Sequence, residues 1–469
     1  MLTTLDNTMK ENIVHALEKA RQTNQSVIVS TVREVDAINP LHFYATAEKL
    51  NIGERFFWSS PSEHFTLVGV GNELILENED NDERFQKIES QWREYPKRLI
   101  AAKHEIGTGP LLFGGFSFDP IKEKDLLWET FSEAKFVLPT KMLTVRQNKT
   151  YLTINKLITP FDDSGTCLQH FESSNENIEK YKYNLDCEKG NEFASIELKT
   201  AEWVEAVQQA TDDIKANQLD KVVLAREVHL EFSETINPYH VIGRLQTEQP
   251  TSFIFCFENG PKQFIGATPE RLVKKQENQV LSTCLAGSIN RGSNKQEDEM
   301  LGNKLLHDEK NLLEHHIVVK MIREALEYCC NDLNVPTNPI LLKTKNIQHL
   351  YTPVRGLAKD GYSLLDMVAK LHPTPALGGY PKQKAVEKIR ELEPMHRGWY
   401  AAPIGWFDHE DNGEFVVAIR SGLIEDNKAA LFAGCGIVSE SDPETEYLET
   451  KMKLKPMMSA LGGKEYEGC

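Results

Sequence analysis

The sequence predicts an α+β protein built mainly on antiparallel sheets. Short β-like runs recur in both halves of the 469 residues, with helix-like stretches between them. The two kinds of segment do not alternate regularly, as the strand–helix–strand units of a parallel sheet would require. Near the C-terminus, three β-like runs follow one another across short polar turns, which is the pattern of an antiparallel meander. These observations together favour an α+β fold.

The first 160 residues mix expected strands with one charged helical stretch. Apolar residues recur at helical spacing across Asn81–Lys103, and Pro96 inside this stretch should kink or split the helix. The following segment, Thr159–Lys199, is polar and acidic, which favours a linker. The strands expected in this part are Ser26–Val32, Phe65–Val70, Leu111–Phe118, Lys141–Val145 and Tyr151–Leu157.

The second half carries clearer signals for both helices and strands. Thr200 can cap a helix whose apolar residues fall on one face, and a strand should begin at Lys221. One long helix is expected within Glu297–Tyr328, and the Pro- and Gly-rich segment His372–Pro381 is expected to be a shaped loop. Further strands are expected at Ser252–Glu258, Gln263–Gly266 and Gln279–Thr283.

The C-terminal stretch predicts a meander followed by a helix. Ser441, Asp442 and Pro443 form a helix start, with Ser or Asp at the cap and Pro in the first turn. The helix should then run through ETEYLETKMKLKPMM. The three expected strands, joined by DNG and EDN turns, are Ile404–Phe407, Glu414–Ile424 and Ala429–Val438.

The net charge of the chain excludes several classes of partner. Lys and Arg number 53 against 70 Asp and Glu, which gives a formal charge of −17. Such a chain is a poor binder of nucleic acid and of anionic membranes, because both need clustered Lys and Arg. With no membrane-spanning run, no signal peptide and no CxxC pair among eight cysteines, we expect a cytoplasmic enzyme with reduced thiols. An acidic enzyme that binds a small anion needs local compensation, by a metal ion or a few basic residues.

Two helical stretches offer carboxylates for a hard metal ion. Glu446, Glu449 and Lys453 share one face of the C-terminal helix, directly after the glycine-interrupted strand end AGCGIV. The simpler alternative is a solvated face with an ordinary Glu–Lys pair. Glu314 on the long helix could supply a second carboxylate, because Mg²⁺ is usually held by one or two carboxylates plus substrate oxygens. For the neighbouring His315 we favour a structural role over zinc binding.

Three further polar residues stand out from their surroundings. Lys221 begins an apolar strand, where partial burial would make it a general base, although a surface Lys is the simpler alternative. Glu270 follows a strand and a Pro, so it is either a functional carboxyl or an ordinary helix-start carboxylate. Arg420 lies inside the apolar run FVVAIRSGL, where a guanidinium normally needs a carboxylate or phosphate partner.

Eight stretches between Thr200 and Met458 resemble, in order, the chorismate-utilising enzymes. The stretches are LDKVVLARE, GATPERLV, LAGS, NLLEH, NIQHL, LHPTPALGG, VAIRSG and GCGIVSESDPETEYLETKMK. The resemblance implies one large α+β unit with two facing, mainly antiparallel sheets flanked by helices. It places the catalytic portion in residues 196–469, while residues 1–195 form an N-terminal portion without a comparable signature.

The resemblance also implies a reaction and the residues that carry it. Water would attack C2 of chorismate and the C4 hydroxyl would leave, which gives isochorismate. Lys221 would be the general base, and Glu270 the general acid, kept protonated by burial. Glu314 and Glu449 would hold Mg²⁺, supported by Glu446. The substrate-binding residues implied are Ser288, His349, His372, Ala376, Arg420, Gly436 and Lys453.

Within this family, the sequence looks most like the isochorismate synthases of the menaquinone pathway. Lys221 is present where anthranilate synthases usually lack it, LAGS replaces the LAGT of amine-transferring members, and the N-terminal region is long. We therefore expect no glutaminase partner. Salicylate synthase, a siderophore-pathway isochorismate synthase, an amine-transferring enzyme and a non-catalytic chorismate-binding subunit remain alternatives. The sequence departs from the family pattern at Asn311, where many relatives have Glu, and at Cys435, which replaces the Ala of the GAGIV pattern.

Overall fold

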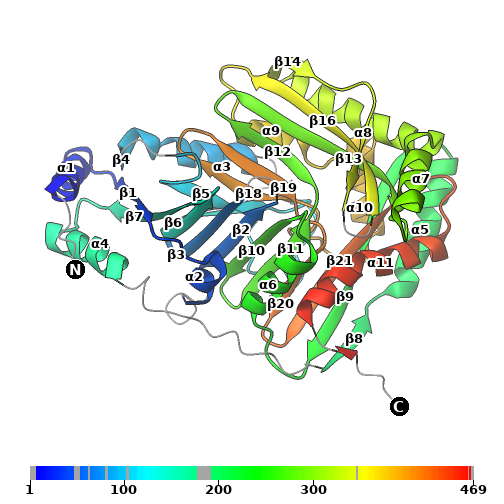
Figure 1. Cartoon of the computed structure of the whole chain (residues 1–469), viewed down its shortest axis with the longest axis horizontal. Helices are drawn as coiled ribbons and strands as arrows, with labels where there is room; N and C mark the ends of the chain where they lie inside the picture. The colour runs from blue at the N-terminus through cyan, green and yellow to red at the C-terminus, as the bar shows by residue number, and fades with distance from the viewer. Residues whose placement is uncertain are drawn as a thin grey trace.

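The computed structural model describes residues 7–46, 53–61, 64–79, 83–101, 105–176, 192–344, 347–462 and 464–465. These residues form two mainly antiparallel sheets joined through one shared strand, with helices packed against them (Figure 1). The shared strand is β6 (Ala134–Arg146). Its residues 134–137 pair with β5 and its residues 141–146 pair with β7, so the hydrogen bonding forks along this strand.

The first sheet follows the order β4-β1-β7-β6-β3-β2-β10-β11-β20-β21-β9-β8-β22. Among the strands of the described residues, only the β1–β4 and β8–β22 pairs in this sheet are parallel, and the short β17 pairs with the start of β9. Its strands besides β6 are β1 (Val27–Val35), β2 (Arg55–Ser60), β3 (Phe65–Asn78), β4 (Leu99–Ala101), β7 (Lys149–Ile158), β8 (Glu192–Glu197), β9 (Lys221–Phe232), β10 (Phe253–Asn259), β11 (Lys262–Thr268), β17 (Gly379–Tyr380), β20 (Ser421–Glu425), β21 (Lys428–Ile437) and β22 (Lys464–Glu465).

The second sheet leaves β6 through β5 and follows the order β5-β18-β19-β12-β13-β16, with β14 and β15 both paired to β16. All of these pairs are antiparallel. The strands are β5 (Leu111–Phe116), β12 (Arg271–Gln276), β13 (Gln279–Asn290), β14 (Cys330–Asn334), β15 (Ile340–Lys343), β16 (Ile347–Ala358), β18 (Pro403–Asp408) and β19 (Gly413–Val417).

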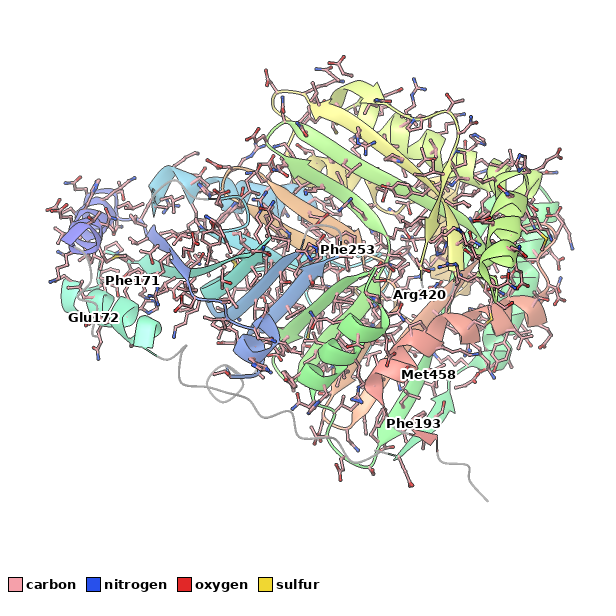
Figure 2. All side chains as sticks on the ribbon, viewed as in Figure 1. Phe171, Glu172, Phe193, Phe253, Arg420 and Met458 are labelled. Atoms are coloured by element: carbon pink, nitrogen blue, oxygen red, sulfur yellow. The ribbon has the colours of Figure 1, made fainter. Side chains whose placement is uncertain are left out.

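The two sheets face each other across an aromatic core. The ring of Phe56 in β2 stacks on that of Phe113 in β5, with 4.4 Å between their centroids. The Arg271 guanidinium in β12 lies 5.2 Å from the ring centroid of Phe253 in β10, which Figure 2 labels near the middle of the molecule. These contacts confirm the expected pair of facing sheets. They also show that strands from both sides of the predicted boundary at residues 195–196 share one core, because β2 pairs with β10 and β5 with β18.

Helices cover the outer faces of both sheets. In Figure 1, α11 lies against β21, and α8 packs on β13 and β16. In the described ranges, no helix is both long and apolar enough to cross a membrane. The helices are α1 (Asn7–Thr23), α2 (Pro40–Thr46), α3 (Arg84–Arg93), the 3₁₀ helix η2 (Pro96–Arg98), α4 (Ser164–Glu176), α5 (Thr200–Lys215), α6 (Pro238–Glu248), α7 (Lys295–Leu306), α8 (Glu309–Glu327), α9 (Leu364–Leu371), α10 (Lys382–Leu392) and α11 (Pro443–Leu461).

The predicted start of the C-terminal helix is confirmed in detail. The Asp442 carboxylate accepts a hydrogen bond of 2.9 Å from the backbone N–H of Thr445, and Pro443 occupies the first helical position. Together they satisfy a free N–H at the helix start and preset the backbone for the first turn. In α5, by contrast, the helix begins at Thr200, and Lys199 occupies the cap position without a side-chain cap. The predicted Thr200 cap is therefore wrong by one residue.

Two segments predicted as single elements are divided in the structure. The expected helix within Glu297–Tyr328 is broken into α7 and α8, because the Asp308 side chain caps a new helix through the N–H of Asn311, at 2.8 Å. The expected strand Glu414–Ile424 is also wrong. Its first part, β19, pairs in the second sheet and its last part, β20, pairs in the first. Arg420 between them has φ +51°, a left-handed conformation that ends one strand before the next begins.

Three other sequence expectations need correction in their extent. The described part of the expected linker Thr159–Lys199 forms α4 and β8, and residues 177–191 lie outside the described residues. Pro96 does split the stretch Asn81–Lys103, but the part after it becomes η2 and β4, and the ends of the stretch lie outside the described residues. The strand β12 was not expected.

The described cysteines, all free and buried, are Cys167, Cys256, Cys284, Cys329, Cys330 and Cys435, while Cys187 and Cys469 are not described.

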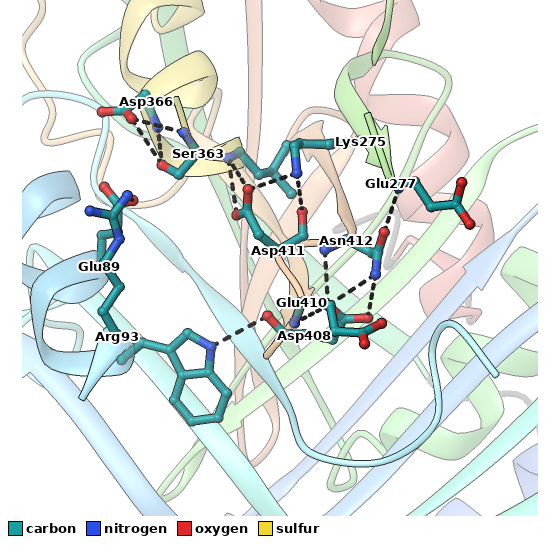
Figure 3. A network of polar contacts seen from close by, with 12 residues as sticks. Glu89, Arg93, Lys275, Glu277, Ser363, Asp366, Asp408, Glu410, Asp411 and Asn412 are labelled. Carbon is teal, nitrogen blue, oxygen red and sulfur yellow. Dashed lines mark hydrogen bonds and ion pairs between the residues drawn. The ribbon is translucent and has the colours of Figure 1, made fainter. Parts of the chain in front are cut away.

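The hairpin between β18 and β19 confirms the predicted DNG turn. Figure 3 shows the polar network that holds it. The Asp408 carboxylate accepts hydrogen bonds of 2.9 Å from the backbone N–H groups of Glu410 and Asn412. The Asp411 carboxylate accepts one of 3.1 Å from the N–H of Leu364 and lies 2.9 Å from Lys275 Nζ, which ties the hairpin to α9 and β12. Burial raises the pKa of Asp408 to about 7.

Candidate active site

The residues predicted to carry the chemistry converge near the start of β9. Their charges act on one another, since Lys221, Lys453 and Arg420 all oppose the rise in the pKa of Glu270. The sheet pairings cause this convergence, because β9 lies beside β21, which leads into α11, and β11 lies beside β20. Lys221 begins β9, Glu270 connects β11 to β12, Glu314 lies on α8, Arg420 connects β19 to β20, and Glu449 and Lys453 lie on α11.

Lys221 is held in a narrow space between α8 and β21. Its Nζ lies 2.5 Å from Glu314 Oε1, and 14% of its side chain is exposed. A Cβ placed on Gly436 would lie 2.8 Å from Lys221 Cε, so only glycine leaves room for the lysine side chain here. The glycine-interrupted strand end therefore marks a place where a side chain passes close to the backbone. The expected contact between the Gly436 backbone and a substrate stays a prediction.

Glu270 is a buried carboxyl held in place by its backbone. Its backbone N–H donates to Thr268 Oγ1 at 3.2 Å, and its carbonyl accepts from Val417 N at 3.0 Å. Burial raises its pKa to about 7, although the positive charges of Lys221, Lys453 and Arg420 pull in the other direction. At neutral pH the carboxyl is therefore protonated in a substantial fraction of molecules, which suits a group that donates a proton.

Glu314 and Glu449 each form an ion pair with a lysine. Burial would raise the pKa of Glu314, but the Lys221 ammonium overrides it and the pKa lies below its ordinary value. Glu449 Oε1 lies 2.6 Å from Lys453 Nζ, which also donates to the carbonyl of Gly434 on β21 at 2.9 Å. Across the part of the chain that the structure describes, no three His, Cys, Asp or Glu side chains form a ready-made metal cage. The two carboxylates could hold a hard cation together with oxygens from water or substrate.

Glu446 and His315 lie behind these groups. The Glu446 carboxylate accepts a hydrogen bond of 2.8 Å from Ser441 Oγ, and burial followed by the nearby charge of Glu449 raises its pKa. The His315 ring bonds the carbonyl of Ala286 at 2.9 Å and the hydroxyl of Thr352 at 2.7 Å. His315 thus joins α8 to β13 and β16, the structural role that the sequence analysis favoured.

Arg420, His349 and Tyr400 form a second group of polar side chains. Burial lowers the pKa of Arg420, against the opposing effects of Tyr400, Glu449 and Glu270. Figure 2 labels Arg420 beside α11. His349 in β16 has a pKa lowered to about 4 by burial, Arg420 and Lys453, so its imidazole is neutral at neutral pH. Tyr400 was missed by sequence reasoning, and its signal was a phenol in the otherwise apolar stretch between Trp399 and Trp406.

The remaining predicted residues lie in different environments. Ser288 is exposed on β13, directly opposite His349 in the strand register. His372 is buried, its Nε2 bonds the carbonyl of Phe118 at 3.0 Å, and its ring packs against Phe118 and Phe85. The structure therefore places the His372 ring in the core, at one end of the expected loop.

The expected loop His372–Pro381 runs beside the start of β9. The carbonyl of Gly378 accepts a hydrogen bond of 2.9 Å from Val223 N, and Ala376 is half-buried against the core. A buried guanidinium, Arg397, donates to the carbonyls of Leu377 at 2.9 Å and Val223 at 2.7 Å. Arg397 was also missed by sequence reasoning. It fixes the loop and β9 to each other.

The two departures from the family pattern have simple structural settings. The side chain of Asn311 donates to Asp308 Oδ1 at 2.9 Å, in the capping turn of α8. A Cβ on Gly287, whose φ is +82°, would lie 3.1 Å from Asn311 Oδ1, so this amide lies against the LAGS segment. Cys435 is buried and hydrogen-bonds to Glu446.

The chain is similar to known proteins along nearly its whole length. Isochorismate synthase MenF of Bacillus subtilis (strain 168) is 46% identical over 469 residues, which cover 99% of each chain. Isochorismate synthase DhbC of the same organism is 35% identical, over 92% of this chain and 98% of that protein. The solved structure of MenF, the menaquinone-specific isochorismate synthase from Escherichia coli, superposes with a TM-score of 0.77 over 96% of this chain and all of the other. At 23% identity, that superposition shows a shared fold. The family model for the chorismate binding enzyme matches residues 15–462, and the chain belongs to this family.

Proposed function

We propose that this protein is an isochorismate synthase, which converts chorismate to isochorismate. The observation that carries the proposal is Glu270, a buried carboxyl with a pKa of about 7 on which the positive charges of Lys221, Lys453 and Arg420 act. A proton donor among cations suits a substrate with two carboxylates and a hydroxyl that must leave. The similarity to two isochorismate synthases of Bacillus subtilis supports the same activity.

The acid and the base divide the reaction between them. Lys221 takes a proton from the water that attacks C2 of the ring. As the new C–O bond forms, the ring double bonds shift and the C4–O bond breaks. Glu270 gives its proton to the departing hydroxyl, which leaves as water. One water is consumed and one released, so the overall reaction is an isomerisation.

Glu314 and Glu449 are the residues that would hold Mg²⁺. Their carboxylate oxygens are the donor type that this ion prefers, and the lysine paired with each shows that a positive charge is stabilised there. When bound, the ion would supply positive charge to the ring carboxylate of the substrate. Glu446, hydrogen-bonded to Ser441, would keep the start of α11 ordered behind Glu449.

The substrate carboxylates would be held by cations and polar groups around the acid and base. We assign this role to Arg420 and Lys453, which are close enough to Glu270 to affect its pKa. His349 would contribute as a neutral hydrogen-bonding group. The further substrate-binding residues proposed from the resemblance are Ser288, Ala376 and Gly436. His372, which the resemblance also implied, has its ring buried against Phe118 and Phe85, and we assign it no contact with the substrate.

We further propose that the product feeds menaquinone biosynthesis in the cytoplasm, without a glutaminase partner. The identity to MenF of Bacillus subtilis, 46%, exceeds that to DhbC of the same organism, 35%. A reaction that uses water as its nucleophile needs no ammonia. The described cysteines are free, which suits a reducing compartment.

Product analysis tests the proposed activity. With chorismate and Mg²⁺, and without ammonia, chromatography should detect isochorismate as the sole product. Salicylate together with pyruvate would assign the protein to the salicylate synthases instead. An aminated product that appears only with ammonia would assign it to the amine-transferring branch.

The proposed metal site predicts the effect of Glu449→Gln. Removing one of two charged ligands should raise the Mg²⁺ concentration for half-maximal activity by about 10- to 100-fold. The matched control is Glu444→Gln, which removes an exposed carboxylate in the first turn of the same helix. An unchanged Mg²⁺ requirement in Glu449→Gln, or an equal change in Glu444→Gln, would contradict the assignment.

A further inference from the structure

Arg226 is a buried cation that the proposed reaction does not use. It lies on β9, the strand that begins with Lys221, and only 2% of the residue is exposed. Leu224 and Val228, two positions away on the same face of the strand, are apolar and buried. Burying a guanidinium costs more free energy than burying an apolar side chain of similar size. The contacts of Arg226 therefore indicate a role beyond packing.

The contacts of Arg226 are to one turn of α11. Its Nε donates to Thr450 Oγ1 at 2.7 Å, and its guanidinium carbon lies 4.6 Å from the centroid of the Tyr447 ring. The Thr450 hydroxyl in turn donates to the carbonyl of Tyr447 at 2.7 Å. These two helix residues flank Glu449 in the sequence, so Arg226 contacts the turn that carries the proposed metal ligand.

A carboxylate from a third element closes the network. Glu197, the last residue of β8, lies 3.1 Å from Arg226 Nη1 and accepts a hydrogen bond of 2.5 Å from the Tyr447 hydroxyl. Its other oxygen lies 3.3 Å from Lys451 Nζ. The pKa of Glu197, which burial would raise, is lowered by these partners, so the carboxylate stays charged. The strands β8 and β9 and the helix α11 are thus joined through one ionic centre.

We propose that Arg226 is a positioning residue that sets where Glu449 lies relative to Lys221. The inference rests on the proposed function, because it takes Glu449 as a ligand of the metal. After this turn of α11, Lys453 donates a hydrogen bond to the Gly434 carbonyl of β21. Before it, Glu446 accepts a hydrogen bond from Ser441. These contacts fix the helix relative to β21 and its own first turn, and Arg226 joins it to β9, the strand of the base.

The structure contains a matched control in Arg55. It too is a buried arginine, 5% exposed, with a carboxylate partner, Glu258 at 2.6 Å, and a tyrosine ring, Tyr44, 4.3 Å from its guanidinium carbon. It joins α2 to β2 and β10, none of which carries a proposed active-site residue. Arg226→Met and Arg55→Met therefore remove the same kind of network from two places.

Direct metal binding separates a positioning role from a merely structural one. We would titrate Mn²⁺, as a paramagnetic probe for the Mg²⁺ site, into each full-length variant and measure free Mn²⁺ by electron paramagnetic resonance. In Arg226→Met the Kd for Mn²⁺ should rise by about 10- to 100-fold, as for other groups that orient a metal ligand. Arg226→Lys should restore part of the affinity, and Arg55→Met should bind Mn²⁺ as the wild type does while it unfolds at a lower temperature.

Two further variants keep the outcome decisive. Thr450→Val removes the acceptor of Arg226 with almost no change in shape, so it should weaken Mn²⁺ binding in the same direction even if Arg226→Met fails to fold. Suppose that Glu449→Gln weakens Mn²⁺ binding as proposed. Unchanged Mn²⁺ affinity in the folded Arg226 and Thr450 variants, or an equal loss of affinity in Arg55→Met, would then overturn the role of Arg226 and leave the metal site standing. If Glu449→Gln also binds Mn²⁺ normally, the proposed metal site fails, and the role of Arg226 fails with it.

Discussion

Replacing Lys221 with Met should lower kcat for isochorismate formation by about 10²- to 10⁴-fold, the usual contribution of a positioned general base. Methionine keeps the length of the side chain that passes Gly436 but cannot accept a proton. It also removes the ammonium that is paired with Glu314 at 2.5 Å. The loss should therefore appear in kcat, while Mn²⁺ binding is retained or becomes tighter because Glu314 loses a competing cation.

The control for this prediction is Lys310→Met. Lys310 also lowers the pKa of Glu314 through its charge, but it lies on the exposed side of α8. It reports the effect of removing a nearby positive charge without removing the base. A kcat in Lys221→Met within a few-fold of that in Lys310→Met would show that Lys221 is not the base.

Replacing Glu270 with Gln should also abolish most of the turnover, because the amide cannot protonate the departing hydroxyl. A loss of about 10²- to 10⁴-fold is expected for a general acid. In the wild type, kcat/KM should fall as the pH rises through about 7, since burial raises the pKa of Glu270 to that value and ionisation removes the proton to be donated. Glu270→Gln should lose this pH dependence from its residual activity.

The same substitution should stabilise the fold at high pH. A carboxyl whose pKa rises from 4.5 in the unfolded chain to about 7 in the folded protein favours folding only while it is protonated. The wild type therefore loses about 3 kcal/mol as the pH rises from below 4.5 to above 7, and the glutamine variant does not. Urea unfolding at pH 8 should show Glu270→Gln as the more stable protein, with little difference near pH 4.

Asp408→Asn provides the control for both effects of Glu270→Gln. Burial raises the pKa of Asp408 to about 7 as well, but this residue lies in the β18–β19 hairpin (Figure 3). The asparagine variant should therefore share the altered pH dependence of stability and keep the wild-type kcat. Equal losses of activity in the two variants would mean that Glu270 acts through stability and not as the acid.

Much of the fold could be predicted because local sequence patterns determine where many of its helices and turns begin and end. Asp442 and Pro443 mark the start of α11 within their own turn, and the DNG turn directs its hairpin regardless of distant contacts. The predictions that were wrong concerned elements whose limits depend on contacts between distant parts of the chain. Nothing near Arg420 in the sequence shows that the chain leaves one sheet there and enters the other, because that depends on which distant strands, β12 and β11, pair on each side.

The site divides in the same way. The residue types of Lys221, Glu270 and Glu449 indicated a base, an acid and a ligand, and the resemblance gave each its place. The partners were not predictable, since Lys221 and Glu314 lie 93 residues apart and meet only because α8 packs beside the start of β9. Tyr400 was missed because it stands in an apolar stretch whose pattern matches ordinary core. Arg397 was missed because the carbonyls that it binds, those of Leu377 and Val223, lie 20 and 174 residues away in the sequence.

The most direct test of the roles of Lys221 and Glu270 is to convert chorismate in water labelled with heavy oxygen, in the presence of Mg²⁺, and to analyse the product by mass spectrometry. In the proposed mechanism, water attacks C2 while the original hydroxyl leaves from C4 with the proton of Glu270. The isochorismate formed should therefore carry the heavy oxygen at C2. Isochorismate without the label would mean that the hydroxyl moves within the molecule, and would contradict the roles given to Lys221 and Glu270.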